Sequence, residues 1–349
     1  MNKKRRILAI VLFALVTAFI GYRTMTKIPN VQTFAMDERD RLPVGRVSIG
    51  LFENYKVVGE SSRYEGLTLH GNDAMSELSF LAWVERRWNE IQQADAKQDM
   101  RHRPKIYRSS PHKVEFKFDY FEVDAPGYKG SSYKGEGAVW MDNKTLFIAP
   151  GGEINADKLI PKISNNISEM KRKDEKGFCL NFYCLNLPVS SNESADITVN
   201  FDDIDGLMLS VNVSTYTSSQ NDYFSERVPS GGVIVSSVTD VAKLLANYYS
   251  NAEKREIDGV IGEQDIFGVS DPIGHEYSTA IQARWYHPGT SGDKSDPSIE
   301  INLIYEFRTD HKPSKSGWFD DETVRQTGFT PEKFMSMWEA TLKSFKRNR

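Results

Sequence analysis

Cysteine is scarce in this chain of 349 residues, which contains only Cys179 and Cys184. Two cysteines cannot form the dense disulfide framework of a small secreted scaffold, and this pair makes no Cys-x-x-Cys redox motif. In an oxidising compartment the two thiols could pair with each other; the alternative is that each is a small buried hydrophobic residue. The spacing alone leaves both interpretations open.

Motifs for catalysis and for metal or cofactor binding are also missing. The six histidines are scattered, and no two lie at the i, i+4 spacing that puts two zinc ligands on one helix face. The segment Gly289–Ser295 resembles a phosphate loop, but Asp293 interrupts the Gly-Lys-Ser run that such a loop needs. Asp203–Gly206 resembles a calcium loop, but Phe201 and Asn212 stand where its first and last carboxylates belong. We therefore expect two surface turns, no metal, no cofactor and no enzymatic activity, although a triad built from distant residues would leave no local signature.

The chain has one long apolar run, Ile7 to Tyr22, directly after the basic cluster Lys3–Arg6. A basic cluster before an apolar run marks the cytoplasmic side of a membrane, so the rest of the chain is predicted to be exported to the periplasm. We favour an uncleaved inner-membrane anchor over residues 1–23, followed by a tether over 24–43. A signal peptide cleaved after Ala18 is the alternative, although the apolar run continues past that residue. Because no cysteine follows the run, a lipoprotein is excluded.

Basic residues are in the minority once the export segment is set aside. Five of the 44 basic residues and none of the 48 acidic ones lie in residues 1–23, which leaves a net charge of −9 on the remainder. This charge disfavours nucleic acid and anionic lipid as partners of the exported part, because both attract basic patches. It is compatible with a basic protein partner.

The exported part is long enough for two domains. Strand and helix patterns are mixed without the βαβ rhythm of a parallel sheet, so the sequence predicts an α+β fold with two antiparallel-sheet domains. We place the first domain at 44–150, a linking helix at 151–176 and the second domain at 177–349.

Several elements are predicted from hydrophobic period and capping residues. A helix is expected after Asp73 as N-cap, and a closing helix after Thr330 as N-cap. Strands and one hairpin turn are expected at Val114–Tyr120, around Asp142–Asn143, and at the stretches Ile197–Phe201, Leu207–Val213, Ala280–Tyr286 and Ile299–Phe307. The apolar faces of the three helices consist of Leu78, Leu81, Val84, Trp88 and Ile91; of Ile160, Ile163, Ile167 and Met170, with Pro161 in the first turn; and of Phe334, Trp338, Leu342 and Phe345.

Short stretches along the chain have an order and spacing typical of one bacterial family. They are Gly45–Arg46, Gly177–Cys179, Ile197–Phe201, Gly206–Thr215, Glu256–Glu263, Arg284–Trp285, Asp296–Pro297, Met337–Trp338 and Ser344–Arg347. On these stretches the sequence resembles immunity proteins that neutralise phospholipase effectors of the type VI secretion system, in the group cognate to class-four lipase effectors. Family members often carry a cysteine just before the Gly-Arg pair, where this chain has Val44. Because Cys184 is additional here, we hypothesise a local Cys179–Cys184 bridge.

The resemblance implies a periplasmic protein whose two domains grip a cognate phospholipase effector and obstruct its active-site entrance or its lid. Recognition is commonly carried by loops. The candidate partner-binding residues are Asp202, Asp203 and Asp205 in the loop Asp202–Asp205, Asp222 and Tyr223 in the loop Ser218–Ser225, and Asp293 in the loop Gly289–Ser295. Each loop could equally be an ordinary solvated turn.

Three other functions fit the sequence less well. An envelope structural or assembly protein would share the anchor and the lack of catalytic motifs. A periplasmic hydrolase would need a dispersed site in a deep polar pocket. A binding protein for a small periplasmic ligand would need an enclosed cavity of ligand size.

Overall fold

The computed structural model describes residues 41–52, 54–72, 74–98, 104–121, 131–150, 156–169, 177–180, 183–216, 253–310 and 327–348. The predicted anchor over residues 1–23 lies outside these ranges. None of the helices in the described ranges combines the length and the apolarity needed to cross a membrane.

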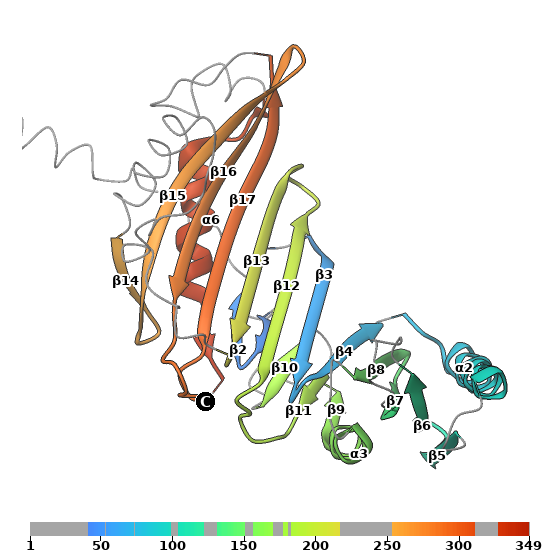
Figure 1. Ribbon diagram of the computed structural model, residues 1–349. Helices are drawn as coiled ribbons and strands as arrows, with labels where there is room; N and C mark the ends of the chain where they lie inside the picture. The colour runs from blue at the N-terminus through green and yellow to red at the C-terminus, as the bar shows by residue number, and fades with distance from the viewer. Residues whose placement is uncertain are drawn as a thin grey trace, which may run out of the picture.

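A twelve-stranded antiparallel sheet forms the body of the molecule (Figure 1). Its strands, in spatial order, are β14 (Glu253–Ile257), β15 (Val260–Ile273), β16 (Glu276–His287), β17 (Ser298–Thr309), β13 (Leu207–Ser214), β12 (Glu193–Phe201), β3 (Tyr55–Tyr64), β4 (Leu67–Asn72), β8 (Lys144–Pro150), β7 (Ser131–Met141), β6 (Lys113–Phe121) and β5 (Lys105–Ser110). Along β12, β13 and most of β17 every second residue is buried, so the period of two in the sequence places one face on the core.

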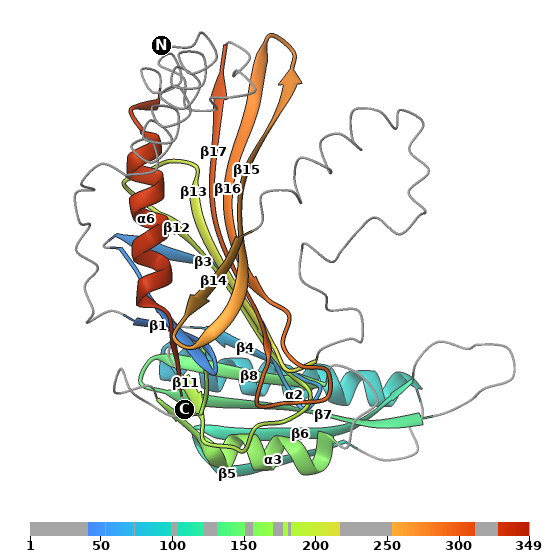
Figure 2. The same cartoon turned by 90° about the vertical axis from the view of Figure 1, so that its left-hand side faces the viewer.

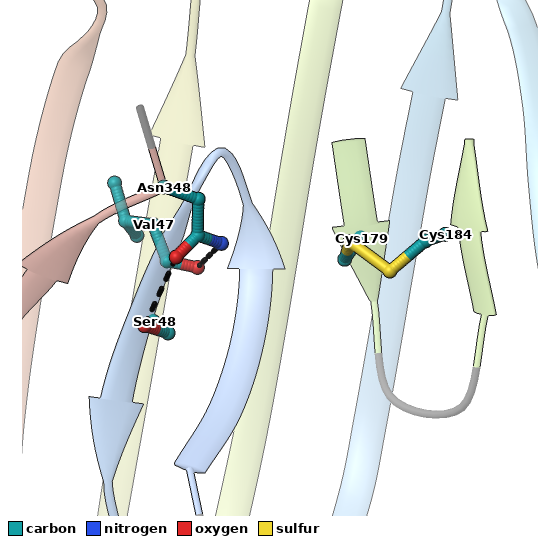
Figure 3. Close-up of a disulfide and its surroundings, with 5 residues drawn as sticks. All are labelled: Val47, Ser48, Cys179, Cys184 and Asn348. Carbon is teal, nitrogen blue, oxygen red and sulfur yellow. Dashed lines mark hydrogen bonds between the residues drawn. A yellow bond between two sulfur atoms is a disulfide. The ribbon is translucent and has the colours of Figure 1, made fainter. Parts of the chain in front are cut away.

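A smaller antiparallel sheet packs on that buried face. Its order is β18 (Lys346–Arg347), β2 (Val47–Gly50), β1 (Arg41–Gly45), β10 (Phe178–Leu180), β11 (Tyr183–Leu185) and β9 (Ile167–Glu169). Three stretches that are distant in sequence, 41–50, 167–185 and 346–347, thus share six short strands, and β1 begins inside the segment predicted as a tether. Asn348 continues past β18, where its side chain donates to the Val47 carbonyl and accepts from the Ser48 hydroxyl (Figure 3).

A disulfide joins Cys179 on β10 to Cys184 on β11 (Figure 3). The two residues face each other in the antiparallel register, and both are buried. The bridge therefore closes a hairpin in the small sheet rather than linking distant parts of the chain.

The disulfide leads to a prediction on stability. Replacing both cysteines with alanine is expected to lower the free energy of unfolding by about 2 kcal/mol, because the bridge restricts a loop of roughly six residues in the unfolded chain. Urea unfolding of the double variant, and of the native chain with and without dithiothreitol, measures the effect. Free thiols at both positions in exported protein, found by mass spectrometry, would contradict it.

In the described part of the chain, three helices cover the large sheet, as Figures 1 and 2 show. α6 (Pro331–Ser344) and α3 (Ala156–Asn166) lie on the same face as the small sheet, and their apolar residues belong to the main core. α2 (Glu77–Gln98) covers the other face at one end, where Phe80 and Val84 pack with Val114, Phe116 and Ala138 in a second, smaller core. The α+β, antiparallel fold class predicted from the sequence is confirmed.

The closing helix follows its capping signals. Thr330 has an extended backbone, its hydroxyl accepts from the Lys333 amide, and Pro331 begins the helix. Phe334, Trp338, Leu342 and Phe345 are all buried, as the stripe predicts. The turn at Asp142–Asn143 also forms as predicted, with positive φ at both residues, as a two-residue hairpin turn of type I′ requires.

The first helix differs from its prediction at both ends. It begins at Glu77 rather than after Asp73, and Ser76 caps it through the Ser79 amide. Leu78, placed on the apolar face, is 80% exposed, whereas Phe80 is fully buried. The helix continues to Gln98, well past Ile91, the last residue of the predicted apolar face. Helical periodicity thus identified the element, but the buried stripe is shifted by two residues at its start.

The linking helix is shorter than predicted. α3 ends at Asn166, and Ile167, assigned to its apolar face, begins the strand β9. Pro161 lies inside the helix rather than in its first turn. The Ser164 side chain donates to the Ile160 carbonyl at 2.6 Å. Met170 lies outside the described residues.

The boundaries 44–150 and 177–349 stay predictions, but the structure shows how the two regions are joined. β3 of the first pairs with β12 of the second over nine residue pairs, so their hydrogen bonding is continuous. β1 likewise pairs with β10. The main core contains side chains from both regions.

α6 is also held to β14 by an ion pair, which leads to a pH prediction. Arg255 donates two hydrogen bonds of 2.7 Å to Glu339 and so holds the pKa of that carboxyl below its usual 4.5. A lowered pKa stabilises the fold above the unfolded value and loses that effect as the pH falls through the folded value. Glu339→Gln is expected to lose at most about 1 kcal/mol at pH 7, because solvent screens the pair. In urea unfolding curves the difference from the native chain should shrink as the pH falls from 7 through the lowered pKa of Glu339; a difference that stays constant on acidification would contradict the assignment.

Candidate partner-binding surfaces

One face of the large sheet is not covered by a described helix over β3, β12, β13 and β17 (Figure 2). We call it the open face. Its outward residues are exposed or half-buried and mix small polar, charged and aliphatic side chains: Lys56, Ser61, Arg63, Asp196, Thr198, Asn200, Met208, Ser210, Asn212, Glu300, Asn302, Ile304, Glu306 and Arg308. The amides, hydroxyls and charged groups of this face can form hydrogen bonds and ion pairs with a partner, although none of these residues is aromatic, the type most enriched in interface cores.

Hydrogen bonds between neighbouring strands fix part of this face. Gln282 donates to Asn302 at 2.8 Å, Asn302 donates to Ser210 at 3.4 Å, and Asn212 donates to Asp196 at 3.3 Å. Side chains that are already oriented lose less conformational entropy when a partner binds. The open face is therefore partly preorganised.

The structure places the candidate aspartates at opposite ends of this face. Asp202, Asp203 and Asp205 lie in the turn that precedes Leu207, which pairs with Tyr305. Asp293 lies in the turn that precedes Ser298, which pairs with Ser214. The eight residues of β13 between the two ends span about 23 Å. These two groups of aspartates therefore do not form one acidic cluster, while Asp222, Tyr223 and the loop Ser218–Ser225 lie outside the described residues.

Both described acidic turns are held by local hydrogen bonds. Asp203 accepts from the Asn54 amide at 2.8 Å, and Gly206 has a φ of +78°, where a Cβ would lie 1.9 Å from the Glu306 carbonyl oxygen. Asp293 accepts from the amide and the hydroxyl of Ser295, which holds the pKa of its carboxyl below the usual range. Both segments are turns, as the sequence predicted, and they present their charges in fixed positions.

A pocket of about 310 Å³ lies at the Asp293 end of the strands, on the core side of the sheet. Six segments meet there: the β1–β2 turn, β10, the start of β12 with the residues before it, the end of β13, the turn before β17, and the end of the chain. Its lining residues are Gly45, Arg46, Val47, Phe178, Val189, Glu193, Val213, Thr215, Lys294, Ser295, Pro297, Arg347 and Asn348. The pocket is thus formed by segments from the whole length of the described chain.

An ion pair is built into this pocket. Arg46 Nε and Nη2 donate to the two carboxylate oxygens of Glu193 at 2.9 and 2.8 Å, and the Ser190 amide donates to the same carboxylate at 2.6 Å. Arg46 also donates to the carbonyls of Leu187 and Pro188. The Glu193 side chain is only 2% exposed. These hydrogen bonds position the β1–β2 turn against the start of β12 and the residues before it.

The turn before β17 contains a histidine–aspartate pair that could suggest catalysis. His287 Nε2 lies 2.9 Å from Asp296 Oδ1, and its Nδ1 lies 2.8 Å from the Ile261 carbonyl oxygen. Thr290 donates to the other oxygen of Asp296 at 2.8 Å. In a catalytic triad the histidine stands between the hydroxyl and the carboxylate, whereas here the carboxylate stands in the middle. The arrangement braces the turn, and within the described ranges no group of three His, Cys, Asp or Glu side chains is suited to hold a metal.

Sequence reasoning did not identify the pocket. Five stretches that contribute lining residues were noted in the sequence only because they carry the family resemblance. They are Gly45–Arg46, Gly177–Cys179, Gly206–Thr215, Asp296–Pro297 and Ser344–Arg347. The convergence of these stretches is the one signal that could have indicated it.

Comparison with known proteins finds solved structures of similar fold but no protein of similar sequence. No family model matches the chain, and no curated protein has a detectably similar sequence. Immunity protein TplEi of the type VI secretion system from Pseudomonas aeruginosa, solved with an "L" peptide, is 15% identical with a TM-score of 0.58. Its apo structure gives 14% and 0.56, and a chain of the Tle4–Tli4 complex gives 14% and 0.62. Each match covers 90% of this chain and 99% of the other. The chain therefore has the fold of these immunity proteins, as the resemblance implied.

Proposed function

We propose that this chain is a periplasmic immunity protein that binds a cognate phospholipase effector of the type VI secretion system and inhibits it. The observation that carries the proposal is the fold shared with type VI immunity proteins over 90% of the chain. The family resemblance read from the sequence supplies the effector class.

Inhibition in this proposal requires a surface and no chemistry. The effector contacts the open face and the turns at its two ends, so that its active-site entrance is obstructed or its lid is held. Many lipases must open a lid to reach their substrate, so fixing the lid stops turnover. The open face measures roughly 14 Å by 23 Å, less than half of the about 800 Å² that each partner buries in a standard interface. The turns must therefore contribute contacts as well.

The location follows from the target. A phospholipase delivered to the periplasm attacks the membrane from that side, so the protecting protein must be present there. We propose that residues 7–22 tether the chain to the inner membrane; the alternative is a cleaved signal peptide and a soluble periplasmic protein. The acidic charge of the remainder keeps the chain from adhering to anionic lipid.

Growth of a susceptible strain tests the proposal. The strain exports to its periplasm the class-four lipase effector from the locus of this chain, with or without the chain co-exported. We expect growth arrest without the chain, growth rescue with it, and a stable complex of the purified pair. If neither rescue nor a complex is observed, the proposal is wrong for that effector, and an envelope assembly role becomes the better interpretation.

The acidic turn between β12 and β13 gives a prediction on binding. Replacing Asp202, Asp203 and Asp205 together by asparagine removes three charges with little change of shape. We expect an association rate about tenfold lower at low salt, and a smaller salt dependence, because charges at an interface rim mainly steer encounter. Asp142→Asn, in the β7–β8 turn, is the matched control and should leave the rate unchanged. Equal rates for the triple variant and the native chain would remove this turn from the interface.

A further inference from the structure

The pocket at the β1–β2 turn has an apolar interior. Val47, Phe178 and Val213 are each at most 4% exposed, and their carbon atoms line it together with Pro297. The polar groups inside are occupied, since Glu193 is bound by Arg46 and the Thr215 hydroxyl is bonded to the Glu193 backbone. What the interior offers to an entering group is therefore hydrophobic contact.

Besides Arg46, the pocket is lined by two other basic residues, Lys294 from the turn before β17 and Arg347 from β18. Neither forms an ion pair with a described carboxylate. The Arg347 backbone amide donates to Asp258, but its side-chain Nε is buried and has no hydrogen-bond acceptor. A buried donor of this kind is costly unless a binding partner supplies an acceptor. The pocket thus combines apolar walls with unmatched positive charge.

We infer that this pocket receives an anchor from the effector protein: one or two apolar side chains next to a carboxylate that pairs with Lys294 and Arg347. The inference rests on the proposed function. A cavity of about 150 Å³ holds a benzene-sized group, so a volume of about 310 Å³ has room for about two. Buried anchors of this type supply most of the affinity of protein interfaces.

A protein segment suits the position of the pocket. The pocket lies beside the end of β13, where Ser214 pairs with Ser298, so an effector lying along the open face reaches it at its edge. The two cations select an acidic segment by charge complementarity. A fatty acid combines an apolar tail with a carboxylate too, so the test must separate the two sources.

The test compares dissociation constants of the purified full chain, in a mild detergent, with the purified lipase effector. Lys294→Glu and Ser295→Trp change exposed residues, the first reversing a charge and the second filling the pocket. We expect each to weaken binding about tenfold, and Lys294→Glu combined with Arg347→Glu to weaken it about a hundredfold. Lys158→Glu, on an exposed position of α3, is the matched control and should leave the dissociation constant unchanged. Urea midpoints equal to the native value show that a loss of binding is not unfolding.

Three results would overturn the inference in distinguishable ways. Native affinity for both exposed-site variants, with the native complex intact, excludes the pocket while the proposed function stands. Failure of the native chain to bind the effector removes both for that pair. Octanoate that binds the native chain but not Lys294→Glu, and does not compete with the effector, assigns the pocket to a fatty acid instead.

Discussion

Replacing Glu193 with alanine is expected to lower the free energy of unfolding by about 3 kcal/mol. Removing one partner of a buried ion pair leaves the other charge without compensation, which costs about 3–5 kcal/mol. Arg46 keeps its bonds to the Leu187 and Pro188 carbonyls and is 17% exposed, so the lower end of that range applies. The pair connects the β1–β2 turn of the small sheet to the first residue of β12 in the large sheet, so its loss weakens the attachment between the two sheets. Urea unfolding, extrapolated to water, measures the change.

Two further variants distinguish the loss of the ion pair from a loss of packing. Replacing Arg46 and Glu193 together with methionine should recover at least half of the stability lost in Glu193→Ala, because two apolar chains of similar length replace a desolvated pair. Glu193→Gln should fall between the native chain and the alanine variant. If Glu193→Ala loses less than about 1 kcal/mol, the pair does not hold the two sheets together.

The sequence predicted elements whose signals are local. Alternation of buried and outward residues identified β12, β13 and β17, because a strand with one face on a core repeats every two residues. Thr330 and Pro331 located the start of α6, since capping depends on a few neighbouring atoms. The positive φ values at Asp142 and Asn143 follow from the same kind of short-range preference.

The arrangement of those elements was not predictable, because it depends on strand pairing across the chain. β3 pairs with β12, and β18 joins β2, over sequence distances that leave no periodic trace. The two candidate acidic turns were each recognised as turns. That they lie at opposite ends of the sheet follows only from the register of β13 against β17. The pocket is lined by six separate segments, so its position depends even more on strand pairing across the chain.

The predicted start of the helix α2 was wrong for a related reason. In α2 the apolar side that packs is set by Val114, Phe116 and Ala138 on the strands beneath it. Leu78 fits the helical period, but it lies beyond that contact and is exposed. The period therefore predicts a helix, while tertiary packing decides which residues of the period are buried.

Trp338→Ala is expected to have the largest effect on stability, a loss of about 4 kcal/mol. The Trp338 side chain is fully buried in the main core, and its indole N–H donates to Gln264 at 3.0 Å. Gln264 also accepts from Arg255, so the indole is part of a small network that joins α6 to β14 and β15. Truncation leaves a large cavity between helix and sheet and removes one of the two hydrogen bonds that the Gln264 side-chain oxygen accepts.

Trp338→Phe distinguishes the two contributions. Phenylalanine keeps most of the buried surface and removes only the indole N–H, so a loss of about 1–2 kcal/mol is expected.

Because a helix of 14 residues is barely stable alone, α6 depends on this contact for its own structure. Urea unfolding of Trp338→Ala followed by both far-ultraviolet circular dichroism and tyrosine fluorescence should then show α6 detaching before the sheet unfolds. A single coincident transition with a loss below about 1.5 kcal/mol would show that the sheet holds together without the helix.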